Sequence, residues 1–211
     1  MVFSPGRSSD HQADLRSHLE ANLRNRSLVH LPAGSTVPAI KGNYWLVIRG
    51  MVRLQAITYH GDEVLLGIAG PGEPFGEPLQ AVEAGEAVSL CPTDLLCLSQ
   101  QDLRQDPTLA LGMLEAVARR LRQAERLLAL MALRRVEERV KGFLELLASD
   151  YGQPCNQGLR LAARITHHEL ACAVGTTRVT VTRVLGLLRD QGWLSLDADR
   201  HLVVAHLPRG H

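Results

Sequence analysis

The sequence predicts an α+β protein with three consecutive parts: a strand-rich N-terminal part, one long helix, and a C-terminal part of short helices and strands. Three observations predict this order. Short apolar–polar runs separated by Gly and Pro fill residues 28–98. A helical apolar repeat fills residues 107–149, and helix-capping residues followed by two apolar runs fill residues 166–204. We place the domains at residues 1–105, 106–134 and 135–211.

Composition is that of a globular protein. The chain has 211 residues, of which 45% are apolar but only 4% aromatic, so Leu, Val and Ala must form most of the core. No apolar run has the length of a membrane span, and residues 1–26 lack the apolar stretch of a signal peptide. We therefore expect a cytoplasmic protein with no membrane partner. The four cysteines have no metal-ligand spacing and are expected to be reduced thiols.

The N-terminal part has the pattern of a sandwich or barrel of short strands. Gly and Pro separate its apolar runs, and the sequence His60-Gly61-Asp62 between two such runs predicts a hairpin tip. The strands are expected at residues 44–48, 51–54, 63–68 and 94–98.

The central helix is expected to begin at Asp106 and Pro107, because Asp caps helices and Pro suits the first turn. Apolar residues then follow at alternating spacings of three and four, which is the heptad pattern of a parallel coiled coil. A second copy of the chain is therefore the expected partner; the alternative is a helix packed on its own domain. The pattern restarts after Arg134 and Arg135, which indicates a break. The residues of this heptad seam are Leu114, Val117, Leu121, Ala124, Leu128 and Met131.

The C-terminal part has the layout of a helix-turn-helix with a wing. Thr166 and Glu169 form a capping box, and Gly175 stands where a tight turn between two helices needs a positive φ. Thr177 is expected to cap a second helix, and residues 193–196 and 201–204 are expected to form the two strands of the wing.

Charge and side-chain chemistry point to DNA as the ligand of this part. Residues 1–105 carry a net charge of −3, whereas residues 156–211 carry seven arginines against four acidic residues. Arg178 begins the second helix and matches the acceptors of guanine, while Arg183 can reach a second base or a phosphate. Methyl groups of Val179 and Thr180 can meet a thymine methyl, and the remaining candidates suit phosphate. The DNA-binding candidates are Thr166, His167, His168, Thr177, Arg178, Val179, Thr180, Thr182 and Arg183.

Other site types are not expected. Adjacent helix residues point about 100° apart, so His167 and His168 cannot easily share a metal, and no metal site is expected. The strand-rich part holds His30 and His60 but no carboxylate cluster or nucleophile motif, so we expect no catalytic residue, no cofactor and no enzyme. The alternative function is a ligand-sensing or protein-interaction module whose winged helix docks a protein, for which the arginine-rich helix face is too polar.

The order of these parts resembles the Crp/Fnr family of bacterial regulators. The stretches Thr176–Gly186, Ile165–Ala171 and Ala148–Gly152 carry the resemblance most densely, and they are similar to the cyanobacterial global nitrogen regulators within that family. The resemblance implies a cyclic-nucleotide-binding-like jelly roll, a dimerisation helix and a winged helix-turn-helix. It also implies base contacts by Arg178 and Arg183, a palindromic site with GTA and TAC half-sites, and RNA polymerase as a further partner.

The effector region departs from the family pattern. Phe75-Gly76-Glu77 resembles the start of the cyclic-nucleotide phosphate cassette, but residues 78–90 contain no basic residue. A buried phosphate needs a cationic partner, so cyclic AMP is not expected to bind. Arg120 and Glu125 match positions that hold 2-oxoglutarate in the nitrogen regulators, and the alternative is that they are solvated charges. The effector candidates are therefore Phe75, Gly76, Arg120 and Glu125, with 2-oxoglutarate as the candidate ligand.

Overall fold

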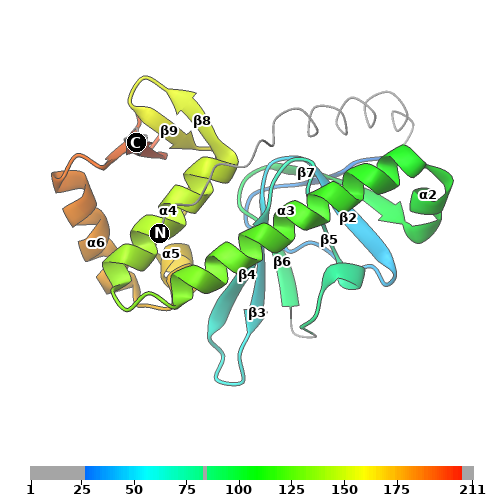
Figure 1. Ribbon diagram of the computed structural model, residues 1–211, viewed down its shortest axis with the longest axis horizontal. Coiled ribbons are helices and arrows are strands. Elements are labelled where there is room, and N and C mark those ends of the chain that lie inside the picture. The colour runs from blue at the N-terminus through cyan, green and yellow to red at the C-terminus, as the bar shows by residue number, and fades with distance from the viewer. Residues whose placement is uncertain (1–26, 83–84, 206–211) are drawn as a thin grey trace. The chain divides into compact units, whose positions relative to one another are not determined.

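The structure is a computed structural model that describes residues 27–82 and 85–205 (Figure 1). Residues 1–26, where no signal peptide was expected, lie outside this range. The chain forms two compact units. Among the described residues, one unit contains residues 27–56, 66–82 and 85–122, and the other contains Ile57–Leu65 and residues 123–205. The α+β class is confirmed, with strands before the long helix and a mixed helical and strand unit after it.

The predicted strand-rich part forms two sheets. One has the order β1–β7–β2–β5 and the other the order β4–β3–β6. The connection between β3 and β4 contains the predicted turn, in which the Gly61 N–H donates to the Thr58 carbonyl at 2.9 Å. The strands are β1 (Val29–Leu31), β2 (Asn43–Arg49), β3 (Val52–Ile57), β4 (Glu63–Ala69), β5 (Pro74–Phe75), β6 (Gly85–Ser89) and β7 (Thr93–Ser99).

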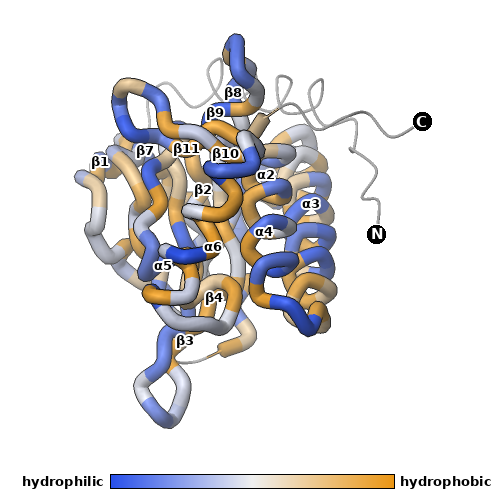
Figure 2. The backbone as a smooth tube through the Cα atoms, turned by 90° about the vertical axis from the view of Figure 1, so that its left-hand side faces the viewer, coloured by the Kyte–Doolittle hydropathy of each residue, from blue (hydrophilic) through white to orange (hydrophobic). Residues whose placement is uncertain are grey.

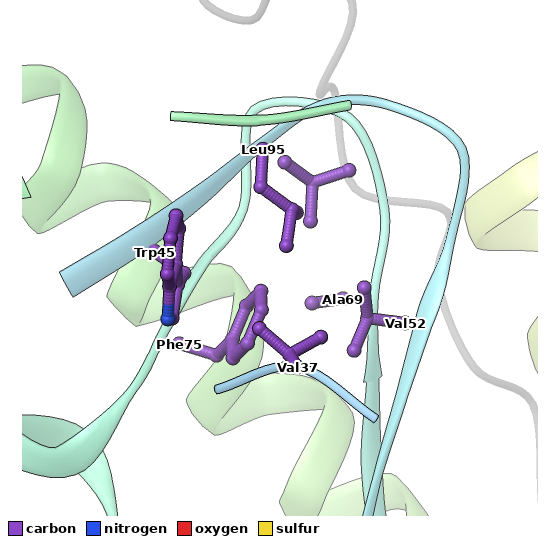
Figure 3. Close-up of a cluster of buried hydrophobic side chains, with 7 residues drawn as sticks. Val37, Trp45, Val52, Ala69, Phe75 and Leu95 are labelled. Carbon is purple, nitrogen blue, oxygen red and sulfur yellow. The ribbon is translucent and has the colours of Figure 1, made fainter. Parts of the chain in front are cut away.

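Side chains from both sheets meet in one apolar core, which makes the arrangement a sandwich. Trp45 and Val47 of β2 alternate with Leu46, so they face one side of their sheet while Leu46 faces the other. Figure 3 shows this core, in which the labelled side chains point toward one another. The cluster consists of Val37, Trp45, Val47, Val52, Ala69, Phe75 and Leu95, all less than 9% exposed.

The opposite face of β2 and β7 is covered by the start of the long helix. Leu46 and Leu98 pack there with Leu109 and Met113 of α3 (Pro107–Met131). The predicted helix start is confirmed, since the Asp106 carboxylate accepts from the Leu109 N–H at 3.0 Å. A short helix α2 (Gln100–Gln105) and a 3₁₀ turn η1 (Glu77–Leu79) were not predicted. Both are too short to show a helical repeat in the sequence.

The predicted break in the helical region is also confirmed. Helix α3 ends at Met131, and α4 (Val136–Tyr151) begins after Arg135 in extended conformation. Side-chain hydropathy alternates along α3 in Figure 2, as expected for a helix with an apolar seam and charged faces. Helix α4 buries Val140, Phe143, Leu144 and Leu147 in the second unit.

The second unit combines three helices with a small sheet. Helices α4, α5 (His167–Val174) and α6 (Arg178–Asp190) pack beside a sheet of order β10–β11–β9–β8. Strands β10 (Leu194–Leu196) and β11 (Leu202–Ala205) confirm the predicted wing. The hairpin of β8 (Gly152–Cys155) and β9 (Gly158–Leu161) was not predicted, because Gly152 and Pro154 indicate only a helix end. Pro154 is tolerated there because β8 is an edge strand.

Gly158 and Gly186 give a test of backbone packing in this unit. A Cβ on Gly158 would lie 2.0 Å from the Val204 carbonyl, at a φ of +147°, whereas one on Gly186 within α6 meets nothing within 4 Å. We expect Gly158→Ala to cost about 1–3 kcal/mol of unfolding free energy, and Gly186→Ala to add about 0.5–1 kcal/mol. Thermal unfolding of the two variants measures both changes, and a neutral Gly158→Ala would contradict the close approach.

Candidate nucleic-acid interface

The turn between α5 and α6 has helix-turn-helix geometry. The chain bends by 103° between the two helices, within the range of about 90–120° typical of this motif. Gly175 makes the bend possible, with φ 60° and ψ 56°, and its N–H donates to the Ala171 carbonyl. Among the described residues, no single helix is long and apolar enough to cross a membrane; only α5 and α6 taken together pass that measure, across this bend.

Both helices begin with the side-chain caps that the sequence predicts. The Thr166 hydroxyl accepts from the Glu169 N–H at 3.1 Å, and the Glu169 carboxylate accepts from the Thr166 N–H at 2.7 Å. The Thr177 hydroxyl accepts from the Thr180 N–H at 3.2 Å at the start of α6. Each cap satisfies N–H groups that have no partner within the helix, so the residues that begin α5 and α6 are fixed in place.

One face of the motif is buried, which fixes the direction of the other. Val181, Val184, Leu185 and Leu188 of α6 are each 3% exposed or less. Helix α5 contributes Leu170, Ala171 and Val174 to the same interior, and α4 packs against both helices. Turning α6 about its axis would bring these aliphatic side chains into water, so the exposed face of α6 has one orientation within the unit.

The exposed face of α6 carries three of the four predicted base contacts together with Thr182, a predicted phosphate contact, whereas Thr180 is partly buried. Arg178, Val179, Thr182 and Arg183 are all exposed, and the apolar side chain of Val179 is 79% exposed. Arg178 and Val179 lie in the first turn of α6, where the peptide dipoles present positive charge. An exposed, cationic and partly apolar helix start is suited to DNA, which has an anionic backbone and whose base edges in the major groove carry methyl groups and hydrogen-bond acceptors.

His167, for which the sequence predicts a phosphate contact, joins the two helices in this structure. Its Nδ1 lies 2.7 Å from the Thr182 hydroxyl oxygen, and that hydroxyl donates to the Arg178 carbonyl at 2.9 Å. Because the single hydroxyl proton is used toward Arg178, the oxygen must accept from Nδ1–H. Burial lowers the pKa of His167, and the charges of Arg178 and Arg189 lower it further, so the neutral ring is favoured in the free protein.

His168 points away from that contact and belongs to another group of side chains. Its Nε2 lies 3.6 Å from the Glu63 carboxylate and 3.6 Å from the Cys172 sulfur. Among the described residues, these three form the group of His, Cys, Asp and Glu side chains close enough to hold one metal ion. Sequence reasoning missed this cluster, because Glu63 and Cys172 are 109 positions apart and no local spacing signals their approach.

The wing is held by a network at its turn. Arg160 of β9 donates to the Asp197 carboxylate, which also accepts from the His201 N–H at 2.7 Å. The hydrogen bond from Arg160 lowers the pKa of Asp197 below its ordinary value. Arg200 takes a positive φ of 62° between the two strands, so the wing turn is tightly constrained.

The four effector candidates lie in different environments. Phe75 is 3% exposed within the sandwich core, and Gly76 begins the 3₁₀ turn with φ 124°. A Cβ at Gly76 would lie 2.9 Å from the Asn43 carbonyl, so the backbone approaches closely there. Arg120 and Glu125 are both on α3, the first partly buried and the second exposed. Five residues on a helix correspond to about 140°, so these two side chains leave different faces of α3.

Comparisons with known proteins place the chain in a family. The family model described as the Crp-like helix-turn-helix domain matches residues 121–209 of this chain. The cyclic AMP receptor protein of Thermus thermophilus is 38% identical over 72% of this chain and 70% of its own length. The global nitrogen regulator of Synechocystis sp. is 30% identical, over 78% of this chain and 76% of its own length. The chain belongs to the Crp/Fnr family of transcription regulators.

Solved structures agree with this assignment. The crystal structure of a Crp/Fnr-family transcriptional regulator from Thermus thermophilus is similar with a TM-score of 0.67 and 27% identity. The similarity covers 86% of this chain and 94% of that one. The resemblance inferred from residues 148–186 is thereby confirmed, and so is the predicted winged helix-turn-helix. The chain is a DNA-binding transcription regulator of the Crp/Fnr type rather than an enzyme.

The lowered pKa of His167 makes the stability of this motif depend on pH. The folded protein disfavours the protonated ring of His167. The neutral ring therefore contributes its full stability above the ordinary pKa of 6.5, and this contribution is lost as pH falls through the lower pKa of the folded state. We expect the melting temperature of the free protein to decrease below about pH 6.5, and to decrease less steeply in His167→Gln. Equal pH slopes for the two proteins in thermal unfolding would contradict this role.

Proposed function

We propose that the chain binds a palindromic DNA site as a homodimer, reads one guanine in each half-site with Arg178, and responds to an effector other than cyclic AMP. The observation that carries the proposal is the exposed start of α6, where Arg178, Val179 and Arg183 project from a helix whose opposite face is buried. Base recognition needs such a fixed orientation, because hydrogen bonds to base edges depend on geometry within tenths of an ångström.

Arg178 is the strongest candidate for base contact. It is the first residue of α6, and recognition helices present their N-terminal residues to the base edges of the major groove. Its guanidinium fork fits the O6 and N7 acceptors of guanine. The Thr182 hydroxyl bonds to the Arg178 carbonyl, so the backbone that carries this side chain is also fixed. Arg183 lies more than one turn further along and can reach a second base or a phosphate.

Phosphate contacts are assigned to residues at the helix starts. Thr166, His167 and His168 begin α5, and Thr177 caps α6, so their N–H groups and side chains lie at positive helix ends. The lowered pKa of His167 favours the neutral ring in the free protein, but a phosphate nearby would favour its protonated form and strengthen the contact. These contacts fix the register of the protein on the duplex and carry no sequence information.

The homodimer is supported by the exposure of the heptad seam. Leu114 is 65% exposed, Leu121 is 62% exposed and Leu128 is 74% exposed, although all three are large aliphatic side chains. Ala124 and Met131 are also exposed, whereas Val117 is partly buried. The seam extends along much of the 25-residue helix, and covering it with a second copy of the chain would remove this apolar surface from water, which is favourable. Two-fold symmetry then explains a palindromic site.

The effector is proposed to differ from cyclic AMP on electrostatic grounds. The absence of a basic residue from 78 to 90 leaves a phosphate in the cassette without a cation, although the Thermus relative is named a cyclic AMP receptor protein. Phe75 fills the sandwich core, so its side chain is already used in packing.

A calorimetric titration is expected to give no heat with cyclic AMP, and micromolar binding would contradict the proposal. Titration with 2-oxoglutarate tests the second candidate, for which Arg120 and Glu125 are the residues to change.

Location and partners follow from binding DNA. A regulator acts where the chromosome lies, which supports the expected cytoplasmic location, and RNA polymerase is the partner through which promoter binding would change transcription. We propose both on the strength of the family and of the exposed face of α6.

Arg178→Ala tests base reading. We expect it to cost about 1–3 kcal/mol per half-site and to relax the preference at one base pair, because a bidentate contact discriminates between bases. Thr166→Ala should instead weaken binding to all sequences alike, since phosphate contacts do not discriminate. Gel shifts on the palindrome and its single-base variants measure both, and an equal loss on every variant for Arg178→Ala would make Arg178 a phosphate contact.

Leu121→Asp tests the dimer. Leu121 is exposed in the single chain, so the substitution leaves the fold intact but buries an unpaired charge in the seam, at about 3–5 kcal/mol. Light scattering should then give the mass of one chain. The matched control is Arg122→Asp, which changes an exposed neighbour outside the seam and should leave the dimer. A dimer that survives Leu121→Asp would place the interface elsewhere.

A further inference from the structure

We propose that Glu63, His168 and Cys172 form a zinc-binding site on the first helix of the helix-turn-helix. His168 and Cys172 are four residues apart on α5, so their side chains leave the same face of the helix, one turn apart. Glu63 approaches from the start of β4, at the end of the β3–β4 turn. The three ligand atoms all lie within 4.8 Å of one another.

The distances between the ligand atoms fit a single small cation. His168 Nε2 lies 3.6 Å from Cys172 Sγ and 3.6 Å from Glu63 Oε2, and Sγ lies 3.9 Å from Oε2. Zinc bonds of about 2.3 Å to sulfur and about 2.0–2.2 Å to nitrogen and oxygen, at tetrahedral angles, place the ligand atoms about 3.3–3.6 Å apart. A shift of a few tenths of an ångström in one exposed side chain would therefore place the three ligand atoms at three corners of a tetrahedron around the ion.

The chemistry of the three ligands selects the metal. A thiolate and an imidazole favour Zn²⁺ over Mg²⁺ or Ca²⁺, which prefer oxygen ligands. One thiolate and one carboxylate also balance the two positive charges of the ion, so the site is neutral when filled. A carboxylate–imidazole ion pair alone would not require the sulfur atom to lie within 4 Å of both partners. The fourth position of the tetrahedron remains open to water.

The site gives zinc a route to DNA binding. His168 is a proposed phosphate contact, and the metal would use its Nε2 and draw the ring toward Glu63. Zinc and DNA then compete for one side chain, so each weakens the binding of the other by the same factor. This regulatory consequence rests on the proposed function, whereas binding of the metal does not.

Metal titrations of the chelator-treated full chain test the site without DNA. Calorimetry with ZnCl₂ should give one ion per chain, and Cys172→Ser, His168→Gln and Glu63→Gln should each weaken binding roughly tenfold or more. Co²⁺ should give a thiolate charge-transfer absorption that Cys172→Ser abolishes. Two matched controls, Cys155→Ser and His60→Gln, remove a half-buried thiol and an exposed imidazole of the same unit and should leave both signals unchanged.

Melting curves establish that each variant is folded before its titration is compared. Zinc should raise the melting temperature of the wild-type chain and of Cys155→Ser, but not that of Cys172→Ser. Zinc affinity that is equal in the wild type and in folded Cys172→Ser, or a cobalt complex without a thiolate band, would overturn the site.

Gel shifts with and without zinc test the competition separately. Zinc should weaken the wild-type DNA complex and leave that of Cys172→Ser unchanged. If the chain binds zinc but no DNA, the proposed function fails and the site stands. If it binds both with no mutual effect, the competition at His168 is wrong.

Discussion

The bend at Gly175 is the constraint on which the DNA-binding face depends. A residue with a Cβ rarely takes the left-handed conformation that Gly175 adopts, and the chain turns by 103° between α5 and α6 at this residue. The bend then allows the aliphatic faces of both helices to pack with α4, which leaves Arg178 and Arg183 outside. The His167–Thr182 hydrogen bond joins the exposed side of the same hairpin, so both its buried and its exposed sides are fixed.

Side chains at the start of α5 illustrate how neighbouring residues acquire different roles. His167 and His168 are adjacent in sequence, but a helix turns about 100° between them. His167 faces α6 and bonds to Thr182, and its lowered pKa follows from burial and from the nearby arginines. His168 faces Glu63 and Cys172 instead. The rotation between the two histidines keeps them from sharing a metal, but it allows His168 to join Cys172, one helical turn away, and Glu63, which is distant in the chain.

The sandwich shows a similar dependence on both faces of one element. Strand β2 presents Trp45 and Val47 to the sandwich core and Leu46 to α3, so the sheet is buried on two sides. Phe75 belongs to the same core, and its place in a cassette-like sequence is therefore compatible with a purely structural role. The long helix α3 is anchored by Leu109 and Met113, while its later turns leave every residue of the heptad seam except Val117 exposed.

The sequence alone determined the features that depend on neighbouring residues. The caps at Asp106, Thr166 and Thr177 and the turn at Gly175 form hydrogen bonds within four residues, so the local sequence predicts them. The heptad seam and the buried face of α6 follow from helical periodicity. Tertiary structure decided what depends on distant partners: the β8–β9 hairpin, whose β9 strand pairs with β11, the bond between His167 and Thr182, and the approach of Glu63 to Cys172. Such contacts are set by how elements pack, and no spacing in the chain encodes them.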